Sequence, residues 1–122
     1  MNVPLKTTVD ELAPRIPGPV TARWPQGERF AVGFTHGSML VELYEPGPVD
    51  TQQPHTRDEL YIVVSGTGGF ECGERRVACG PHDVLFARAG ERHRFVDTTP
   101  EFRTWVVFYG PEGGEADQEQ QR

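Results

Sequence analysis

From residue 28 onward, short runs of apolar and β-branched residues alternate with clusters of glycine, proline and polar residues. Runs of about five to seven residues bounded by such turn-forming clusters are typical of β-strands. We expect strands over residues 29–35, 38–44, 53–55, 59–65, 69–72, 75–78, 83–87, 93–97 and 102–108. His36 and Gly37 would form a two-residue hairpin turn between the first two strands. The spacing predicts an all-β sandwich, jelly roll or small barrel.

The two ends of the chain have a different pattern. Residues 7–15 predict a short helix capped by Thr8 or Asp10, and prolines from Pro14 onward end it. The last residues are rich in Glu, Gln and Gly, have nothing to bury and are expected to be disordered. We divide the chain into an N-terminal arm that packs on the barrel or on a partner (1–27), a β-barrel (28–110) and an acidic tail (111–122).

Composition and charge narrow the classes of function. The 122 residues suffice for one domain, and 13 valines against 6 leucines favour strands over helices. The chain has 18 acidic and 12 basic side chains and a net charge of −6, without the basic patch that nucleic-acid binding requires. No signal-peptide pattern opens the sequence, and no apolar run approaches the roughly 20 residues that span a bilayer. We therefore expect a cytoplasmic protein that binds neither nucleic acid nor membrane.

Two cysteines lie in one predicted hairpin. A turn at residues 73–74 would place Cys72 opposite Arg75 and Cys79 opposite Gly68. The two sulfurs would then be too far apart along the ladder for a disulfide. We expect both thiols to be reduced, small and buried.

A group of polar side chains in the middle of the chain carries the candidate chemistry. Gln53, His55 and Glu59 are separated by two and four residues, so an uninterrupted strand would point all three to one face. His93 begins a later predicted strand and would reach the same interior in a barrel. Two imidazoles and a carboxylate can hold one divalent transition metal: Fe, Mn, Ni, Cu or Zn. A polar, metal-free pocket is the alternative.

Four further residues are candidates for contact with a substrate. Tyr61 shares the face of Glu59, and its hydroxyl could orient a substrate or donate a proton. Arg57 would lie on the same strand face, between His55 and Glu59, and could bind a carboxylate of the substrate. A solvated position at the barrel mouth is the alternative. Tyr44 and Trp105 could line a pocket, with ordinary barrel packing as the alternative role.

The middle segment resembles the two motifs of the cupin superfamily. The first motif runs Gly, His-x-His, three or four residues, Glu, six residues, Gly, and His55, Glu59 and Gly66 match it in place. The second motif runs Gly, five residues, Pro-x-Gly, two residues, His, and its closing part matches Gly90 and His93. Two departures from the motifs are Gln53, which stands where the first histidine would be, and Arg88, which replaces the proline with one extra residue before it.

This resemblance spans residues 37–110 and implies a single-domain cupin with a jelly-roll, or double-stranded β-helix, barrel. It implies His55, Glu59 and His93 as metal ligands, with Gln53 as a weaker fourth. It also implies a small oxygen-rich substrate, dioxygenase, isomerase, lyase or decarboxylase chemistry, and a homodimer. Because Gln53 weakens the first ligand position, a non-catalytic cupin that senses or stores a small molecule is the alternative function. A structural cupin with a vestigial pocket is a third hypothesis.

Overall fold

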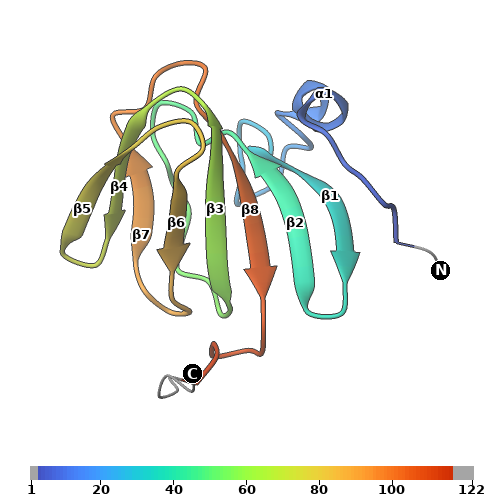
Figure 1. The fold of residues 1–122 in the computed structure, drawn as a ribbon. Coiled ribbons are helices and arrows are strands. Elements are labelled where there is room, and N and C mark those ends of the chain that lie inside the picture. The colour runs from blue at the N-terminus through green and yellow to red at the C-terminus, as the bar shows by residue number, and fades with distance from the viewer. Residues whose placement is uncertain (1–2, 117–122) are drawn as a thin grey trace.

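The computed structural model describes residues 3–116 and has eight strands in two antiparallel sheets (Figure 1). The order of strands is β1-β2-β8-β3-β6 in the larger sheet and β5-β4-β7 in the smaller one. The strands are β1 (Phe30–His36), β2 (Met39–Tyr44), β3 (Asp58–Ser65), β4 (Gly68–Cys72), β5 (Arg75–Cys79), β6 (Val84–Ala87), β7 (His93–Val96) and β8 (Arg103–Tyr109). The all-β jelly-roll prediction is confirmed.

The main core lies between the two sheets because alternate side chains of each strand point inward. On β8, Thr104, Val106 and Phe108 are buried, whereas their neighbours are half-buried. Val106 and Phe108 pack in one apolar cluster with Phe70 and Phe95 of the smaller sheet. The cluster joins the sheets and surrounds the polar residues that form the candidate site.

A second, smaller cluster attaches the N-terminal arm to the barrel. Helix α1 (Val9–Leu12) begins after Thr8, whose hydroxyl accepts a hydrogen bond of 3.1 Å from the Glu11 amide, and a 3₁₀ turn, η1 (Ala13–Arg15), follows. Leu12 is 2% exposed and packs with Ala31 and Leu43 on the outer face of the larger sheet. The predicted helix and its Thr8 cap are confirmed. In residues 3–116, no helix is long and apolar enough to cross a membrane.

Two local predictions are wrong. Residues 53–55 form no strand, because the Gln52 amide donates to the Asp50 side chain in a turn and Pro54 has no amide to offer a ladder. His36 pairs with Met39, so the hairpin turn lies one residue later, at Gly37 and Ser38. Gly37 has a φ of +57°, which a tight hairpin turn favours.

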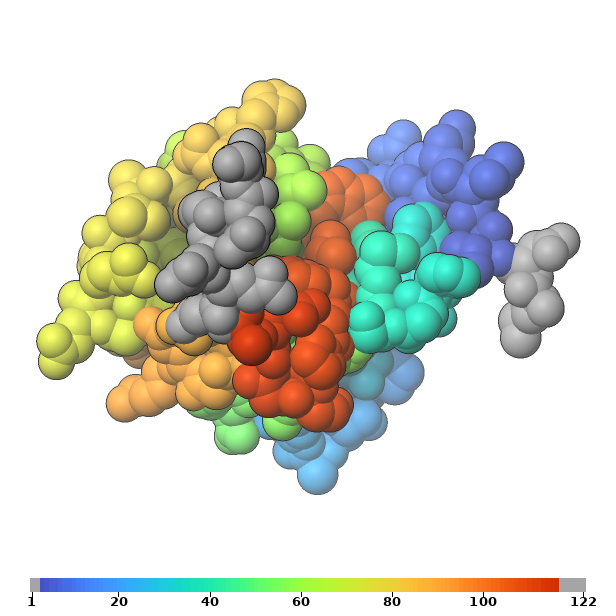
Figure 2. Space-filling view, turned by 60° about the horizontal axis from the view of Figure 1, so that its bottom comes forward, coloured from blue at the N-terminus to red at the C-terminus, as the bar shows by residue number. Residues whose placement is uncertain are grey.

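The register of the β4–β5 hairpin matches the prediction. Cys72 lies opposite Arg75 and Cys79 lies opposite Gly68, and both cysteines are free and buried. Beyond β8, the Gly113 amide donates to the Thr56 carbonyl and the Glu115 amide donates to Asp58. Figure 2 shows this C-terminal segment, in red, between the β1–β2 hairpin, in cyan, and the segments coloured yellow to orange. Residues 117–122, the rest of the predicted tail, lie outside the described residues.

Candidate metal and ligand site

The candidate site is built from both sheets. On β3, Glu59 and Tyr61 point into the barrel and are each 1% exposed, because they alternate with the outward residues Leu60 and Ile62. His93 is the first residue of β7, in the smaller sheet. The irregular segment before β3 supplies His55, whose ring centre lies 5.4 Å from that of His93.

The two imidazoles converge on the Glu59 carboxylate. Nδ1 of His55 lies 2.7 Å from Oε2 of Glu59, and Nε2 of His93 lies 3.0 Å from Oε1. Despite these distances, His55 Nδ1, Glu59 Oε2 and His93 Nε2 are buried without a hydrogen bond of good geometry in the described part of the chain. Ligand atoms of the three residues lie within 4.8 Å of one another. Buried donor atoms of this kind fit a divalent transition metal.

The orientation of His93 also suits a metal ligand. Its Nδ1 lies 2.8 Å from the carbonyl oxygen of Glu91, and a carbonyl can only accept, so Nδ1 carries the proton. This leaves Nε2 facing Glu59, an arrangement in which a backbone carbonyl fixes the tautomer of a ligating histidine.

Electrostatics keep the Glu59 carboxylate ionised. Burial by itself would raise the pKa of Glu59, but the adjacent imidazoles of His55 and His93 outweigh it and lower the pKa from 4.5 to about 2. For His93, burial lowers the pKa, while Glu59 and the Glu91 carbonyl raise it more, so the net pKa is raised. An anionic carboxylate between two imidazoles is the charge state that a cation requires.

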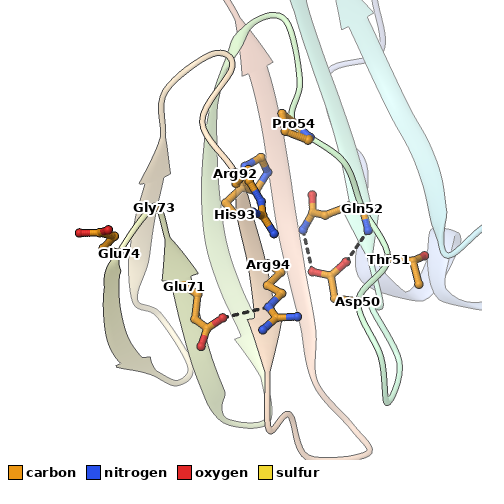
Figure 3. A pocket seen from close by; sticks show the side chains of 10 residues that line it. All are labelled: Asp50, Thr51, Gln52, Pro54, Glu71, Gly73, Glu74, Arg92, His93 and Arg94. Carbon is orange, nitrogen blue, oxygen red and sulfur yellow. Dashed lines mark hydrogen bonds and ion pairs between the residues drawn. The ribbon is translucent and has the colours of Figure 1, made fainter.

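A buried hydrogen-bond network supports the site. The Tyr61 hydroxyl contacts Glu59 Oε1 and lies 3.1 Å from Oε1 of Gln52. Gln52 in turn donates its side-chain amide to Asp50 at 2.7 Å, and both bonds between these two residues are visible in Figure 3. Asp50 also accepts hydrogen bonds from the Tyr44 hydroxyl at 2.5 Å and the Phe95 amide at 2.8 Å. Burial raises the pKa of Tyr44 and Tyr61, so both hydroxyls remain neutral donors.

Two hollows adjoin this network. One, of about 350 Å³, is walled mainly by apolar side chains and includes His55, Gln52 and Tyr61. Its remaining lining residues are Arg23, Trp24, Phe30, Val32, Leu40, Glu42, Tyr44, Val106 and Phe108. The other, of about 480 Å³, is more polar and is lined by His93 and Gln52 together with charged residues such as Glu71 and Arg94 (Figure 3). Gln52 lines both hollows. We call the first one the apolar cavity.

Comparison with known proteins identifies the family of the chain. The family model of the cupin domain matches residues 40–109, more than half of the chain. The chain belongs to the cupin family. An uncharacterized protein of Streptomyces coelicolor is 36% identical over 77 residues, which cover 62% of this chain and 73% of that protein.

Solved structures show the same barrel. A cupin 2 conserved barrel domain protein from Salinispora arenicola superposes with a TM-score of 0.57 at 19% identity, covering 66% of this chain and 74% of that one. TT1209 from Thermus thermophilus superposes with a TM-score of 0.55 at 26% identity, covering 66% and 83% of the two chains.

The structure brings together most of the residues that resemble the cupin motifs. His55, Glu59 and His93 meet, and Tyr44 and Tyr61 line the apolar cavity. The motif glycine Gly66 has a φ of +75°, and a Cβ there would lie 2.6 Å from the Thr99 hydroxyl, so steric crowding and backbone conformation both require glycine.

Three other candidates lie elsewhere. Gln53 is exposed and lines neither hollow, because without a strand at residues 53–55 the parity that placed it beside His55 does not hold. The Arg57 guanidinium donates to the Ser38 carbonyl and covers the Phe108 ring at 5.8 Å, outside the lining of the apolar cavity. Trp105 lies on the outer face of β8 and packs with Leu12 and Leu43.

Two polar residues of the site, Asp50 and Glu42, were not among the sequence candidates, and parity wrongly favoured Gln53 over its neighbour Gln52. Asp50 and Gln52 lie in an irregular segment, where no periodicity could reveal that they point inward. Glu42 had a visible signal: it is the one charged residue of the β2 run Met39–Tyr44 and shares its parity with Leu40 and Tyr44. A charged residue on the buried face of a strand is a sign of function.

Proposed function

We propose that this cupin binds one divalent transition metal through His55, Glu59 and His93 and acts on a small oxygen-bearing metabolite. The observation that carries the proposal is the set of three buried donor atoms, one on each residue, that converge without hydrogen bonds of good geometry in residues 3–116. Buried polar atoms without partners are costly, and a cation would satisfy all three together.

The donor set suits Fe, Mn, Ni, Cu or Zn, since it combines two imidazoles with one carboxylate. When bound, such a metal polarises a substrate oxygen or activates dioxygen or water. The protein's own groups would set the rest of the chemistry. The Glu91 carbonyl orients His93, and the Tyr61 hydroxyl donates to Glu59 and would have to release that bond to give a proton to a substrate.

The apolar cavity beside His55 is the place we assign to the substrate. Its aromatic walls would exclude water and hold an apolar body, while Tyr44 and Tyr61 would supply hydroxyls. Dioxygenase, isomerase and lyase reactions all fit this arrangement. Arg57 and Trp105 have no part in the proposal.

A second candidate is a non-catalytic cupin that senses or stores a small molecule. One observation favours it: the amide that reaches the site, that of Gln52, already bonds to Asp50 and Tyr61, so three side chains supply the whole donor set described here. A site with three protein ligands would bind metal less tightly than one with four.

Metal content tests the proposal. We would measure it by inductively coupled plasma mass spectrometry on the wild type and on His93→Ala, purified identically and again after anaerobic loading with Fe(II), Mn(II), Ni(II) and Zn(II). His36→Ala is the matched control, because His36 is exposed at the end of β1. We expect near-stoichiometric metal in the wild type and the control, and a loss of at least tenfold in His93→Ala. A folded wild type that takes up no metal would overturn the proposal. The non-catalytic cupin that binds a small molecule would then be the remaining candidate.

A further inference from the structure

A carboxyl group that the proposed metal site does not use faces the apolar cavity from β2. Leu40, Glu42 and Tyr44 point into the cavity, while Leu43 between them faces the outer cluster with Leu12. Glu42 is 8% exposed, so it is almost as buried as the core residues around it.

Glu42 differs from the other buried carboxylates in having no partner. Its side-chain oxygens make no hydrogen bond or ion pair with any residue between 3 and 116, whereas Asp50 accepts four hydrogen bonds and Glu59 contacts two imidazoles and a hydroxyl. Burial of a carboxyl group without a protein partner favours its neutral form, and water or another molecule in the cavity would complete its hydrogen bonding.

No described residue in the walls of the cavity makes a hydrogen bond or an ion pair with the Glu42 side chain. Its cross-strand neighbour on β8 is Val106, and Trp24 and Phe30 line the same cavity with ring centres 6.0 Å apart, edge to face. Arg23 also lines the cavity, but its guanidinium lies 5.7 Å above the Trp24 ring and forms no ion pair with Glu42. The groups that can satisfy Glu42 must therefore come from a ligand or from water.

We propose that Glu42 is a ligand-binding residue: as a neutral carboxylic acid it donates a hydrogen bond to an oxygen acceptor on an aromatic or similarly apolar ligand in the cavity. The proposal rests on the proposed function in taking the apolar cavity as the ligand site, and it narrows the substrate class. A ligand would present one oxygen to Glu42 and another to the side of the cavity where His55 lies. The ligand body would lie against the rings of Trp24, Phe30 and Phe108.

Charge in the surroundings supports the neutral form. Burial, together with the negative charges of Glu59 and Glu28, raises the pKa of Glu42 from 4.5 to about 8. At neutral pH the Glu42 carboxyl group is therefore protonated in most molecules. It loses this proton, and with it the ability to donate a hydrogen bond, as the pH rises through 8. The titratable and charged groups that line the cavity with Glu42 or act on it through charge are Arg23, Glu28, Tyr44, His55, Glu59 and Tyr61.

Three probes of similar size test the proposal without chelating a metal. Ethylbenzene is apolar, acetophenone adds a carbonyl acceptor and phenethylamine adds a cation. Dissociation constants would be measured by NMR shift titration of the protein as purified, with its metal content recorded, for wild type, Glu42→Gln, Glu42→Leu and the control Glu101→Leu. Glu101 is an exposed acid in the turn before β8.

We expect the preference for acetophenone over ethylbenzene to fall about fivefold in Glu42→Leu, the effect of one lost hydrogen bond, and to persist in Glu42→Gln and Glu101→Leu. Raising the pH from 6 to 9 should reduce the preference in the wild type and leave Glu42→Gln unchanged, a comparison that does not require Glu42→Leu to fold.

An unchanged preference in both comparisons would overturn the proposal, as would absence of probe binding to the wild type. A wild-type preference for phenethylamine that Glu42→Gln removes would also overturn it, since Glu42 would then be an anion that binds cations. If no metal is found but the acetophenone preference depends on Glu42, the metal proposal fails and this one stands.

Discussion

Replacing Glu42 by glutamine is expected to stabilise the protein at alkaline pH and to matter little at acid pH. The folded protein holds the Glu42 proton up to about pH 8, whereas the unfolded chain releases it near pH 4.5. Between these values the unfolded state binds fewer protons, so the free energy of unfolding of the wild type falls as pH rises. Glutamine has nearly the same shape and does not titrate, so the variant lacks this loss.

The size of the effect follows from the two pKa values. Each pKa unit corresponds to about 1.36 kcal/mol, so a change from 4.5 to about 8 gives an upper estimate of about 4 to 5 kcal/mol. Since Glu42 is 8% exposed, solvent screening reduces this figure little. The difference in the free energy of unfolding between the variant and the wild type should therefore be constant below pH 4.5, widen to pH 8 and level off above it.

Urea denaturation of chelator-treated protein between pH 4 and 9 measures this difference. Other ionisable groups are common to both proteins, and their contributions largely cancel in the comparison. Glu101→Gln, at an exposed position, is the control and should give a flat difference. A flat difference for Glu42→Gln between pH 4.5 and 8 would refute the neutral carboxyl and with it the role as hydrogen-bond donor.

Other changes test the fold and the assembly. Leu12→Ala should lower the free energy of unfolding by about 2 to 3 kcal/mol in urea titrations, because Leu12 anchors the N-terminal arm at 2% exposure. Gly66→Ala should lower the free energy of unfolding by more than about 2 kcal/mol, and Gly37→Ala should lower it by about 1 kcal/mol. Both glycines have a positive φ, but only a Cβ at Gly66 would clash with its neighbours. Equal losses would contradict this explanation. The expected homodimer should give twice the 13.6 kDa of the chain in light scattering, and Phe86→Asp should return it to the monomer if the exposed apolar face of edge strand β6 forms the interface.

Most of the barrel was predictable because its strands alternate and its turns carry glycine, proline or Asx residues. The β4–β5 register followed from one short turn, and the separation of Cys72 and Cys79 followed from the register. The polar segment before β3 was not predictable in this way. There the Asp50 side chain accepts hydrogen bonds from Gln52, which forms a turn in place of strand pairing. The strand alternation assumed for this segment therefore pointed to Gln53, whereas Gln52 is the residue that reaches the site.

Trp105 shows a different limit of sequence reasoning. An aromatic residue in a strand can pack inward or outward, and the alternation of β8 alone leaves both choices open. The outer face of the larger sheet is covered by α1, and this helix of four residues thus gives Trp105 an apolar contact outside the barrel.

The two glutamates near the cavity divide the chemistry between them. Two imidazoles lower the pKa of Glu59 to about 2, whereas burial and neighbouring negative charge raise that of Glu42 to about 8. Environments that push the pKa values of two carboxyl groups apart give them different roles. Glu59 is an anion that suits a cation and Glu42 is a neutral acid that suits an oxygen acceptor. A ligand that satisfies both must therefore carry one oxygen toward the His55–Glu59–His93 group and a second, uncoordinated oxygen toward β2, joined by an apolar body that fits a cavity of about 350 Å³.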